Sequence, residues 1–274
     1  MDVKALTNRE IQLETLKIMK VIAGICEKEK IVYTLAYGTL IGAIRHDGFI
    51  PWDDDLDIHM PRNDFEKFKE YCFTHKEELK PFELFTPETH KSYPYMIPRF
   101  CNTEFLLIPH NEKPCGMGTF VDIYPLDGFG NDFKYIRKHS NLAKFPASCY
   151  FLCAQTKITP ADHKGMFLPK VFLFFLVKII GKKFFYNKCM KWANMFLFDE
   201  SEFVAPMRWF YGVDDVFRKD EILRTEFHKF EDCEFRIPVE YDKILKQLYG
   251  DYMELPPESK RIGHHFYEIF KKEY

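Results

Sequence analysis

The sequence lacks the cysteine spacing on which many zinc sites and redox motifs are built. Its eight cysteines are scattered along the chain, and no two of them stand in a Cys-x-x-Cys pair. Because disulfide frameworks and zinc sites need cysteines in defined groups, we expect reduced thiols in a cytoplasmic protein. Residues 1–9 are polar and form no apolar signal segment, which agrees with that location.

The chain also lacks a strong excess of charge of either sign. Its formal net charge is −2, and hydrophobic residues make up 46% of the composition. A net charge near zero gives no reason to expect nucleic acid as a partner, and this hydrophobic content argues against a disordered chain. Aromatic residues reach 17%, more than a minimal core needs, so we expect some of them to line a ligand or lipid surface.

Acidic residues are nearly absent from residues 133–198, where Asp162 is the only one. Basic residues are frequent there: Lys134, Arg137, Lys138, Lys144, Lys157, Lys164, Lys170, Lys178, Lys182, Lys183, Lys188 and Lys191. We therefore expect three parts: a catalytic core over residues 1–132, a basic and mostly helical module over residues 133–198, and a C-terminal segment over residues 199–274 that packs back on the core.

Within the basic module, residues 166–180 are almost wholly apolar, with Pro169, Lys170 and Lys178 as the interruptions. The segment is too short and too charged to span a bilayer, which takes about 20 apolar residues. Two interpretations stay open. Either it is a core helix whose lysines reach the surface, or it lies in a membrane interface and gives the protein a peripheral membrane contact.

Periodicity and turn residues predict alternating helices and strands. Helices are expected over residues 8–28, 40–45, 63–73 and 239–249, and strands over residues 31–37, 49–60, 120–124 and 234–238. Residues 81–114, rich in Pro, Tyr and Thr, predict short strands and loops. Pro125 and the turn signal Asp127-Gly128 predict the end of the third strand.

The acidic run Asp53-Asp54-Asp55-Leu56-Asp57 is the most informative segment. On a strand, Asp53, Asp55 and Asp57 share one face, where they repel one another unless a cation neutralises them. Oxygen ligands of this kind select Mg²⁺ or Mn²⁺ over zinc or copper. A solvated acidic turn is the alternative, but the run stands in an apolar frame, so we favour the metal site.

A further carboxylate, Asp122, stands between Val121 and Ile123 in a predicted strand. A charge inside a buried strand is costly, so such a residue is usually paired or functional. An Asp facing water at a sheet edge is the alternative. The presence of Asp55 and Asp57 favours a joint site.

Gly38-Thr39 follows a predicted strand and opens a short helix. Backbone N–H groups at such a turn, together with the Thr hydroxyl, can bind phosphate, although strand-to-helix turns with glycine are common. Arg45 follows shortly after and can contact phosphate as a fork; its alternative is a surface arginine.

Together these segments resemble the LicD family of phosphotransferases, which also takes in the fukutin-related proteins. The matching blocks are Tyr37-Gly38-Thr39-Leu40-Ile41-Gly42-Ala43-Ile44-Arg45-His46, Gly48-Phe49-Ile50-Pro51-Trp52-Asp53-Asp54-Asp55-Leu56-Asp57-Ile58, Phe120-Val121-Asp122-Ile123-Tyr124-Pro125-Leu126-Asp127-Gly128, and Leu248-Tyr249-Gly250-Asp251-Tyr252 with Leu255-Pro256-Pro257. The arginine of the family's middle block is Arg99, although Pro98 stands where members often carry a basic residue.

The resemblance implies an α+β fold with a nucleotidyltransferase-like core, in which a mixed sheet is flanked by helices. It implies that Asp55, Asp57 and Asp122 are catalytic and bind Mg²⁺ or Mn²⁺, and that Gly38, Thr39, Arg45 and Arg99 bind substrate. The implied reaction moves a phospho-alcohol, such as phosphocholine, from a CDP-activated donor to a sugar hydroxyl of a cell-surface glycan or teichoic-acid-type precursor. CMP is the leaving group. The implied acceptor is a glycan, either lipid-linked or free, and a lipid-linked acceptor implies that the enzyme works at the inner face of the cell membrane.

Two other functions stay open at this point. A true nucleotidyltransferase, moving NMP to a small molecule or nucleic acid, would use the same three acids, and the basic stretch keeps that interpretation open. A non-catalytic interaction protein is the other alternative, but it has no need to hold mutually repelling carboxylates.

Overall fold

The computed structural model describes residues 4–159, 167–207, 212–261, 263 and 267–273. Asp162, Lys164 and Met166 of the predicted basic module lie outside the described residues.

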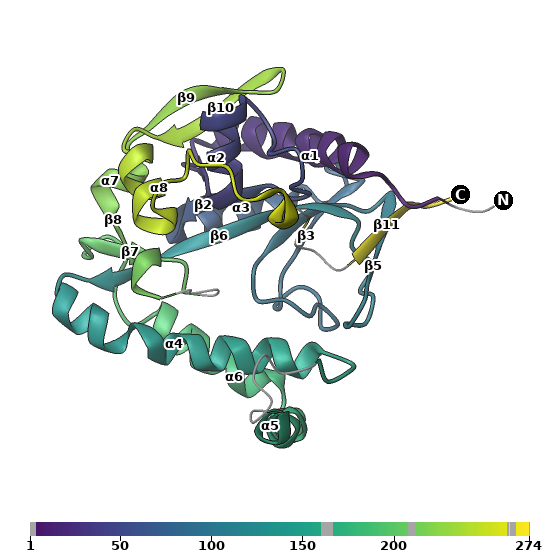
Figure 1. Cartoon of the computed structure of the whole chain (residues 1–274), viewed down its shortest axis with the longest axis vertical. Helices are drawn as coiled ribbons and strands as arrows, with labels where there is room; N and C mark the ends of the chain where they lie inside the picture. Colours follow the sequence, from purple (N-terminus) through teal and green to yellow (C-terminus); the bar gives the residue numbers. More distant parts are fainter. Residues whose placement is uncertain (1–3, 160–166, 208–211, 262, 264–266, 274) are drawn as a thin grey trace.

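A mixed seven-stranded sheet forms the centre of the fold (Figure 1). Its main path runs β1 (Thr34–Leu35), β2 (Asp57–Pro61), β6 (Thr119–Gly130), β4 (Arg99–Asn102) and β3 (Phe82–Phe85), and β7 (Phe203–Ala205) and β8 (Phe217–Arg218) extend it from β6. β2 and β6 are parallel, whereas the neighbouring pairs are antiparallel. This arrangement confirms the predicted α+β fold with a mixed sheet and flanking helices.

Three helices pack on this sheet: α1 (Asn8–Glu29), α2 (Tyr37–His46) and α3 (Arg62–Thr74). α1 begins at a capping box, in which the Thr7 hydroxyl accepts the N–H of Glu10 and the Glu10 carboxylate accepts the N–H of Thr7. Its apolar side chains, Ile18 and Ile22 among them, are buried in the main hydrophobic core with residues of the sheet. The helices predicted at these three places are confirmed, with small shifts at their ends.

The C-terminal part returns to the core. The hairpin of β9 (Thr225–Phe230) and β10 (Cys233–Pro238) is followed by α8 (Tyr241–Tyr249), and β11 (Tyr267–Lys271) pairs with β5 (Phe105–Pro109). The short elements α7 (Lys219–Leu223), η2 (Val213–Asp215) and η3 (Glu258–Lys260) connect these pieces.

A helical layer consists of α4 (Phe133–Ala154), α5 (Phe167–Ile180) and α6 (Lys182–Ala193). α4 and α6 lie below the sheet in the view of Figure 1, and α5 lies outermost. The three helices share a hydrophobic cluster that includes Tyr150, Val177 and Phe185. The helical character expected for this stretch is confirmed, and within the described ranges no helix is both long and apolar enough to cross a membrane.

The strand predicted over residues 49–60 is wrong up to Leu56, because β2 begins only at Asp57. Residues before Asp57 form a turn and an irregular loop in which three backbone carbonyls bond to side chains of α1, and Leu56 O, next to Asp57, accepts the N–H of Asp122 on β6. Asn8 donates to Pro51 O and Asp53 O, and Gln12 donates to Ile50 O and Asp53 O. The alternation argument therefore applies to Asp57 but not to Asp53 or Asp55.

The third predicted strand is too short, because β6 runs through Pro125 and Asp127 to Gly130. Pro125 has no N–H to donate. In a strand its nitrogen faces the same side as the N–H of Ile123, which donates to Pro98 O on the β4 side. Because β4 pairs with β6 no further than Asp122, no hydrogen bond of that pair is lost at Pro125. Beyond that point β6 pairs with β7, in the register Asp127 to Ala205.

Candidate active site

A cleft with a volume of about 1190 Å³ opens above the strands that carry the predicted acids. Its walls combine carboxylates, two arginines and several aromatic rings. The residues that line it include Gly38, Arg45, Trp52, Asp53, Asp55, Asp57, Tyr95, Arg99, Glu112, Asp122, Tyr124, Phe151, Asp214, Tyr249, Asp251, Tyr252 and Glu254.

Three carboxylates meet at one point of this cleft. Asp57 and Asp122 lie side by side because β2 and β6 are parallel and pair in the register Asp57 to Asp122. Asp55, two residues earlier on the incoming loop, completes the group, and one carboxylate oxygen of each lies within 4.8 Å of the others. The structure thus brings together the three acids that the sequence predicts as catalytic and metal-binding residues.

Burial makes this cluster costly without a cation. Asp57 and Asp122 are 7% and 2% exposed. Burial, together with the negative charges of Asp55 and Asp122, raises the pKa of Asp57 well above its usual range. Asp57 Oδ1 is moreover buried without a hydrogen-bond partner among the described residues. An oxygen-only donor set with a buried oxygen left unsatisfied fits Mg²⁺ or Mn²⁺.

Arg99 belongs to the same group. It stands opposite Asp122 in the antiparallel pair of β4 and β6, and its Nε donates to Asp122 Oδ1 at 2.7 Å while Nη2 donates to Oδ2 at 3.3 Å. The guanidinium lies between the rings of Tyr95 and Phe120, 4.0 and 3.9 Å from their centroids. Sequence reasoning expects Arg99 at a substrate phosphate. The structure shows it on the wall of the cleft but ion-paired with a predicted metal ligand.

The two residues of the predicted phosphate-binding turn, Gly38 and Thr39, have different roles in the structure. Gly38 lines the cleft, and a Cβ at this position would lie 2.8 Å from Asp53 Oδ2, so a side chain there would require the Asp53 carboxylate to move. Thr39 is 4% exposed and is not among the residues that line the cleft. Its hydroxyl accepts the N–H of Asp57 at 2.8 Å, which fixes the start of β2.

Arg45 lies on the wall of the cleft. Its Nη1 donates to the carbonyl oxygens of Tyr252 and Glu254 at 2.6 and 3.3 Å, which ties α2 to the segment after α8. Burial, and then the charge of Arg261, lowers the pKa of Arg45. This contact explains why the late block Leu248 to Pro257, distant in sequence, belongs to the same site as the first block.

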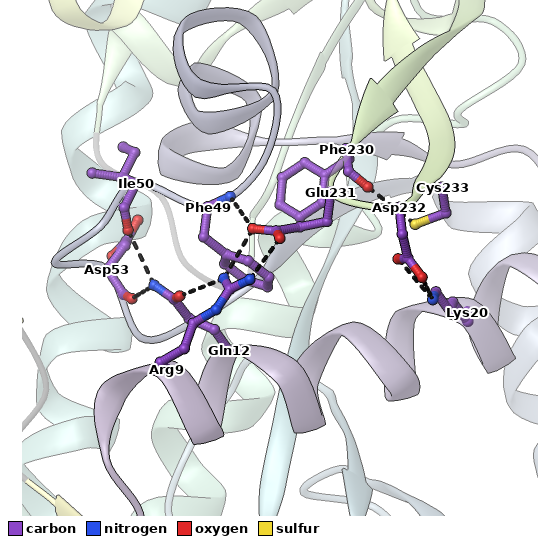
Figure 2. Close-up of polar contacts among 10 residues, drawn as sticks. All are labelled: Arg9, Gln12, Lys20, Phe49, Ile50, Asp53, Phe230, Glu231, Asp232 and Cys233. Carbon is purple, nitrogen blue, oxygen red and sulfur yellow. Dashed lines mark hydrogen bonds and ion pairs between the residues drawn. The ribbon is translucent and has the colours of Figure 1, made fainter.

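Sequence reasoning missed the support that α1 gives to the acidic loop (Figure 2). The Gln12 amide is 3% exposed and donates at 2.7 Å to Asp53 O and at 3.2 Å to Ile50 O. One turn earlier on α1, Arg9 pairs with both carboxylate oxygens of Glu231, and Glu231 Oε1 accepts the N–H of Phe49. No signal in the sequence points to these long-range contacts, because Gln12 is an ordinary residue in a helix.

Aromatic side chains cover much of the remaining wall: Trp52, Tyr95, Tyr124, Tyr249 and Tyr252. Acidic side chains accompany them: Glu112, Asp214, Asp251 and Glu254. Such a wall favours a ligand that carries a cationic group, because π-faces and carboxylates both attract positive charge.

Comparison with known proteins agrees with this geometry. The family described as LicD/FKTN/FKRP, nucleotidyltransferase domain, matches residues 30–160, which include all three carboxylates and Arg99. Residues 30–160 form a LicD-family nucleotidyltransferase domain. The resemblance seen in the sequence motifs is thereby confirmed over residues 30–160.

Relatives extend the similarity beyond this domain. The chain is 29% identical over 280 aligned residues to the lipopolysaccharide cholinephosphotransferase LicD of Haemophilus influenzae, and the alignment covers 97% of this chain and 99% of that protein. It is also 32% identical over 135 residues to an uncharacterised protein of Rickettsia typhi, covering 48% of this chain and 39% of that protein. The match to LicD includes the helical layer and the C-terminal part.

Proposed function

We propose that this enzyme transfers phosphocholine from CDP-choline to a sugar hydroxyl of a lipopolysaccharide-type glycan and releases CMP, in the cytoplasm. The observation that carries the proposal is the composition of the cleft, where a buried carboxylate trio adjoins a wall of aromatic and acidic side chains. The name of the Haemophilus relative supports phosphocholine as the transferred group and lipopolysaccharide as the acceptor class. The eight free cysteines support a reducing compartment.

In the proposed reaction the sugar oxygen attacks the phosphorus atom that carries choline. A new P–O bond forms, the bond to the bridging oxygen of the diphosphate breaks, and CMP departs with that oxygen. A divalent cation held by Asp55, Asp57 and Asp122 would neutralise charge on the diphosphate and on the leaving CMP. A carboxylate of the trio also takes the proton from the sugar hydroxyl, since these are the acids beside the reacting phosphorus.

The other residues bind and orient the donor. Arg99 holds Asp122 in a fixed orientation, because its guanidinium donates to both carboxylate oxygens. Arg45 and the backbone at Gly38 face the cleft where the diphosphate would lie. Trp52 and Tyr124 line the cleft, so their rings would contact the quaternary ammonium of choline.

The test compares donors in the presence of a glycan acceptor at saturating Mg²⁺, by following CMP or diphosphate release from CDP-choline, CDP-ribitol, CDP-glycerol and CTP. We expect turnover with CDP-choline to exceed that with the uncharged CDP-alcohols by at least about 10-fold, equivalent to ~1.4 kcal/mol of cation–π and charge attraction. Trp52→Leu should remove much of this preference for CDP-choline and leave turnover with CDP-glycerol unchanged. Equal turnover of CDP-choline and CDP-glycerol would refute the choline assignment, and diphosphate release from CTP would favour a nucleotidyltransferase.

A further inference from the structure

Helix α5 carries a row of exposed apolar side chains, which we call the α5 outer face. Its members follow the spacing i, i+4, i+7, i+8 and i+11 and are Leu168, Phe172, Phe175, Leu176 and Ile179. Leu168, Phe172 and Ile179 are 77%, 70% and 82% exposed. Single exposed apolar residues are common on soluble proteins, but a continuous row of this size marks an interaction surface.

The opposite side of α5 accounts for the fold of the layer. Phe174 is buried, and Val177 is buried in the core that α5 shares with α4 and α6. Cys153 of α4 donates its thiol to Val177 O at 3.1 Å. Because this side holds the helix in place, the α5 outer face is not needed for packing within the described part of the chain.

The helical layer that carries the α5 outer face is basic. Lys183 and Lys188 of α6 are exposed, whereas Lys178 Nζ donates to Cys153 O and Gln155 O at the end of α4. Asp162 is the only acidic residue between residues 133 and 198. Protein–protein interfaces are depleted in lysine, whereas lysines beside apolar side chains match the head groups and acyl chains of an anionic bilayer.

We propose that the α5 outer face docks the enzyme onto an anionic membrane surface, with its apolar side chains at the boundary of head groups and acyl chains. The helix has 14 residues, about 21 Å in length, and lies along the surface rather than across the bilayer. α4 links this surface to the cleft, because its Phe151 lines the cleft while its Cys153 contacts α5. An acceptor anchored in the membrane is thereby brought near the carboxylate trio.

Vesicle sedimentation tests this proposal without any substrate, so it stands or falls independently of the proposed reaction. The full chain is mixed with vesicles of phosphatidylcholine alone or of phosphatidylcholine and phosphatidylglycerol, at low and high salt. We expect binding to the anionic vesicles that weakens with salt. Phe172→Glu/Ile179→Glu should weaken it at least ~10-fold, because two carboxylates would enter the acyl region.

The matched control is Phe73→Glu/Phe227→Glu, which adds the same charges at residues 74% and 57% exposed on other elements. This control should bind vesicles as the wild type does, and all variants should keep the wild-type circular dichroism. Absence of binding to anionic vesicles at low salt, or equal loss in both double variants, would overturn the proposal. Sedimentation velocity gives a further outcome that would overturn the proposal: a wild-type dimer that becomes monomeric in Phe172→Glu/Ile179→Glu. In that case a second copy of the chain covers the α5 outer face.

Discussion

Replacing Arg99 by methionine should destabilise the fold and make its stability depend on a divalent cation. Arg99 is 5% exposed, and its guanidinium is bonded to Asp122, which stands next to Asp57 in the sheet. Methionine keeps the apolar packing between Tyr95 and Phe120 but removes the positive charge. Removing one partner of a buried ion pair costs about 3–5 kcal/mol, because the remaining charge stays buried.

The expected rescue distinguishes this site from any other buried ion pair. Without Arg99, a bound cation is the remaining positive charge beside the carboxylates, so saturating Mg²⁺ or Mn²⁺ should restore more stability to Arg99→Met than it adds to the wild type. Arg62→Met is the matched control, since Arg62 pairs with the buried Asp127 on the same strand at 2.6 Å but outside the cleft.

Urea unfolding followed by circular dichroism, with and without the cation, measures both effects. Arg62→Met should lose stability to a similar degree and gain no more from the cation than the wild type does. A loss below about 1 kcal/mol in metal-free Arg99→Met, or equal rescue of both variants, would refute the reasoning.

Two further predictions concern the support of the acidic loop. Gln12→Ala removes the 2.7 Å hydrogen bond to the carbonyl of Asp53. We expect kcat to fall at least ~10-fold and the free energy of unfolding to fall by about 1–3 kcal/mol. An unchanged kcat in steady-state kinetics would exclude a positioning role for Gln12. Gly42→Ala should destabilise the fold by about 1–3 kcal/mol, because the added Cβ would lie 2.4 Å from Gly48 O. Gly24→Ala is the control in a helix: its Cβ would meet no neighbouring atom within 4 Å, so it should stabilise the fold by about 1 kcal/mol. Urea unfolding decides between these signs, and stabilisation in both variants would contradict the close approach of α2 to the loop.

Local pattern was enough to predict most elements and the three acids. The apolar period of α1 and the capping box at Thr7 are properties of neighbouring residues, so they can be recognised without the fold. Asp122 was identifiable because a charge between Val121 and Ile123 needs a reason to be buried. Its position directly beside Asp57 follows from the parallel register of β2 and β6, which no local pattern encodes.

The remaining features depend on contacts between distant segments. The apolar residues before Asp57 resemble a strand, yet the carbonyl of Asp53 is bonded to Asn8 and Gln12 of α1, and the sheet begins only at Asp57. The place of Thr39 after Gly38 predicts a phosphate contact, but its hydroxyl accepts the backbone N–H of Asp57. For residues 166–180 the sequence does not distinguish a core helix from a membrane-interface helix, because α5 is apolar on two sides. One of these sides is buried and the other is exposed.

The central claim is that the carboxylate trio performs a cation-dependent transfer from CDP-choline. The most direct test is CMP release from CDP-choline in the presence of a glycan acceptor, at saturating Mg²⁺, by the wild type and by Asp57→Asn. The surface variant Asp47→Asn, 60% exposed at its side chain, is the control for the substitution itself. We predict that turnover requires the divalent cation, persists in Asp47→Asn and is abolished in a folded Asp57→Asn, whereas wild-type CMP release from Asp57→Asn would contradict the claim.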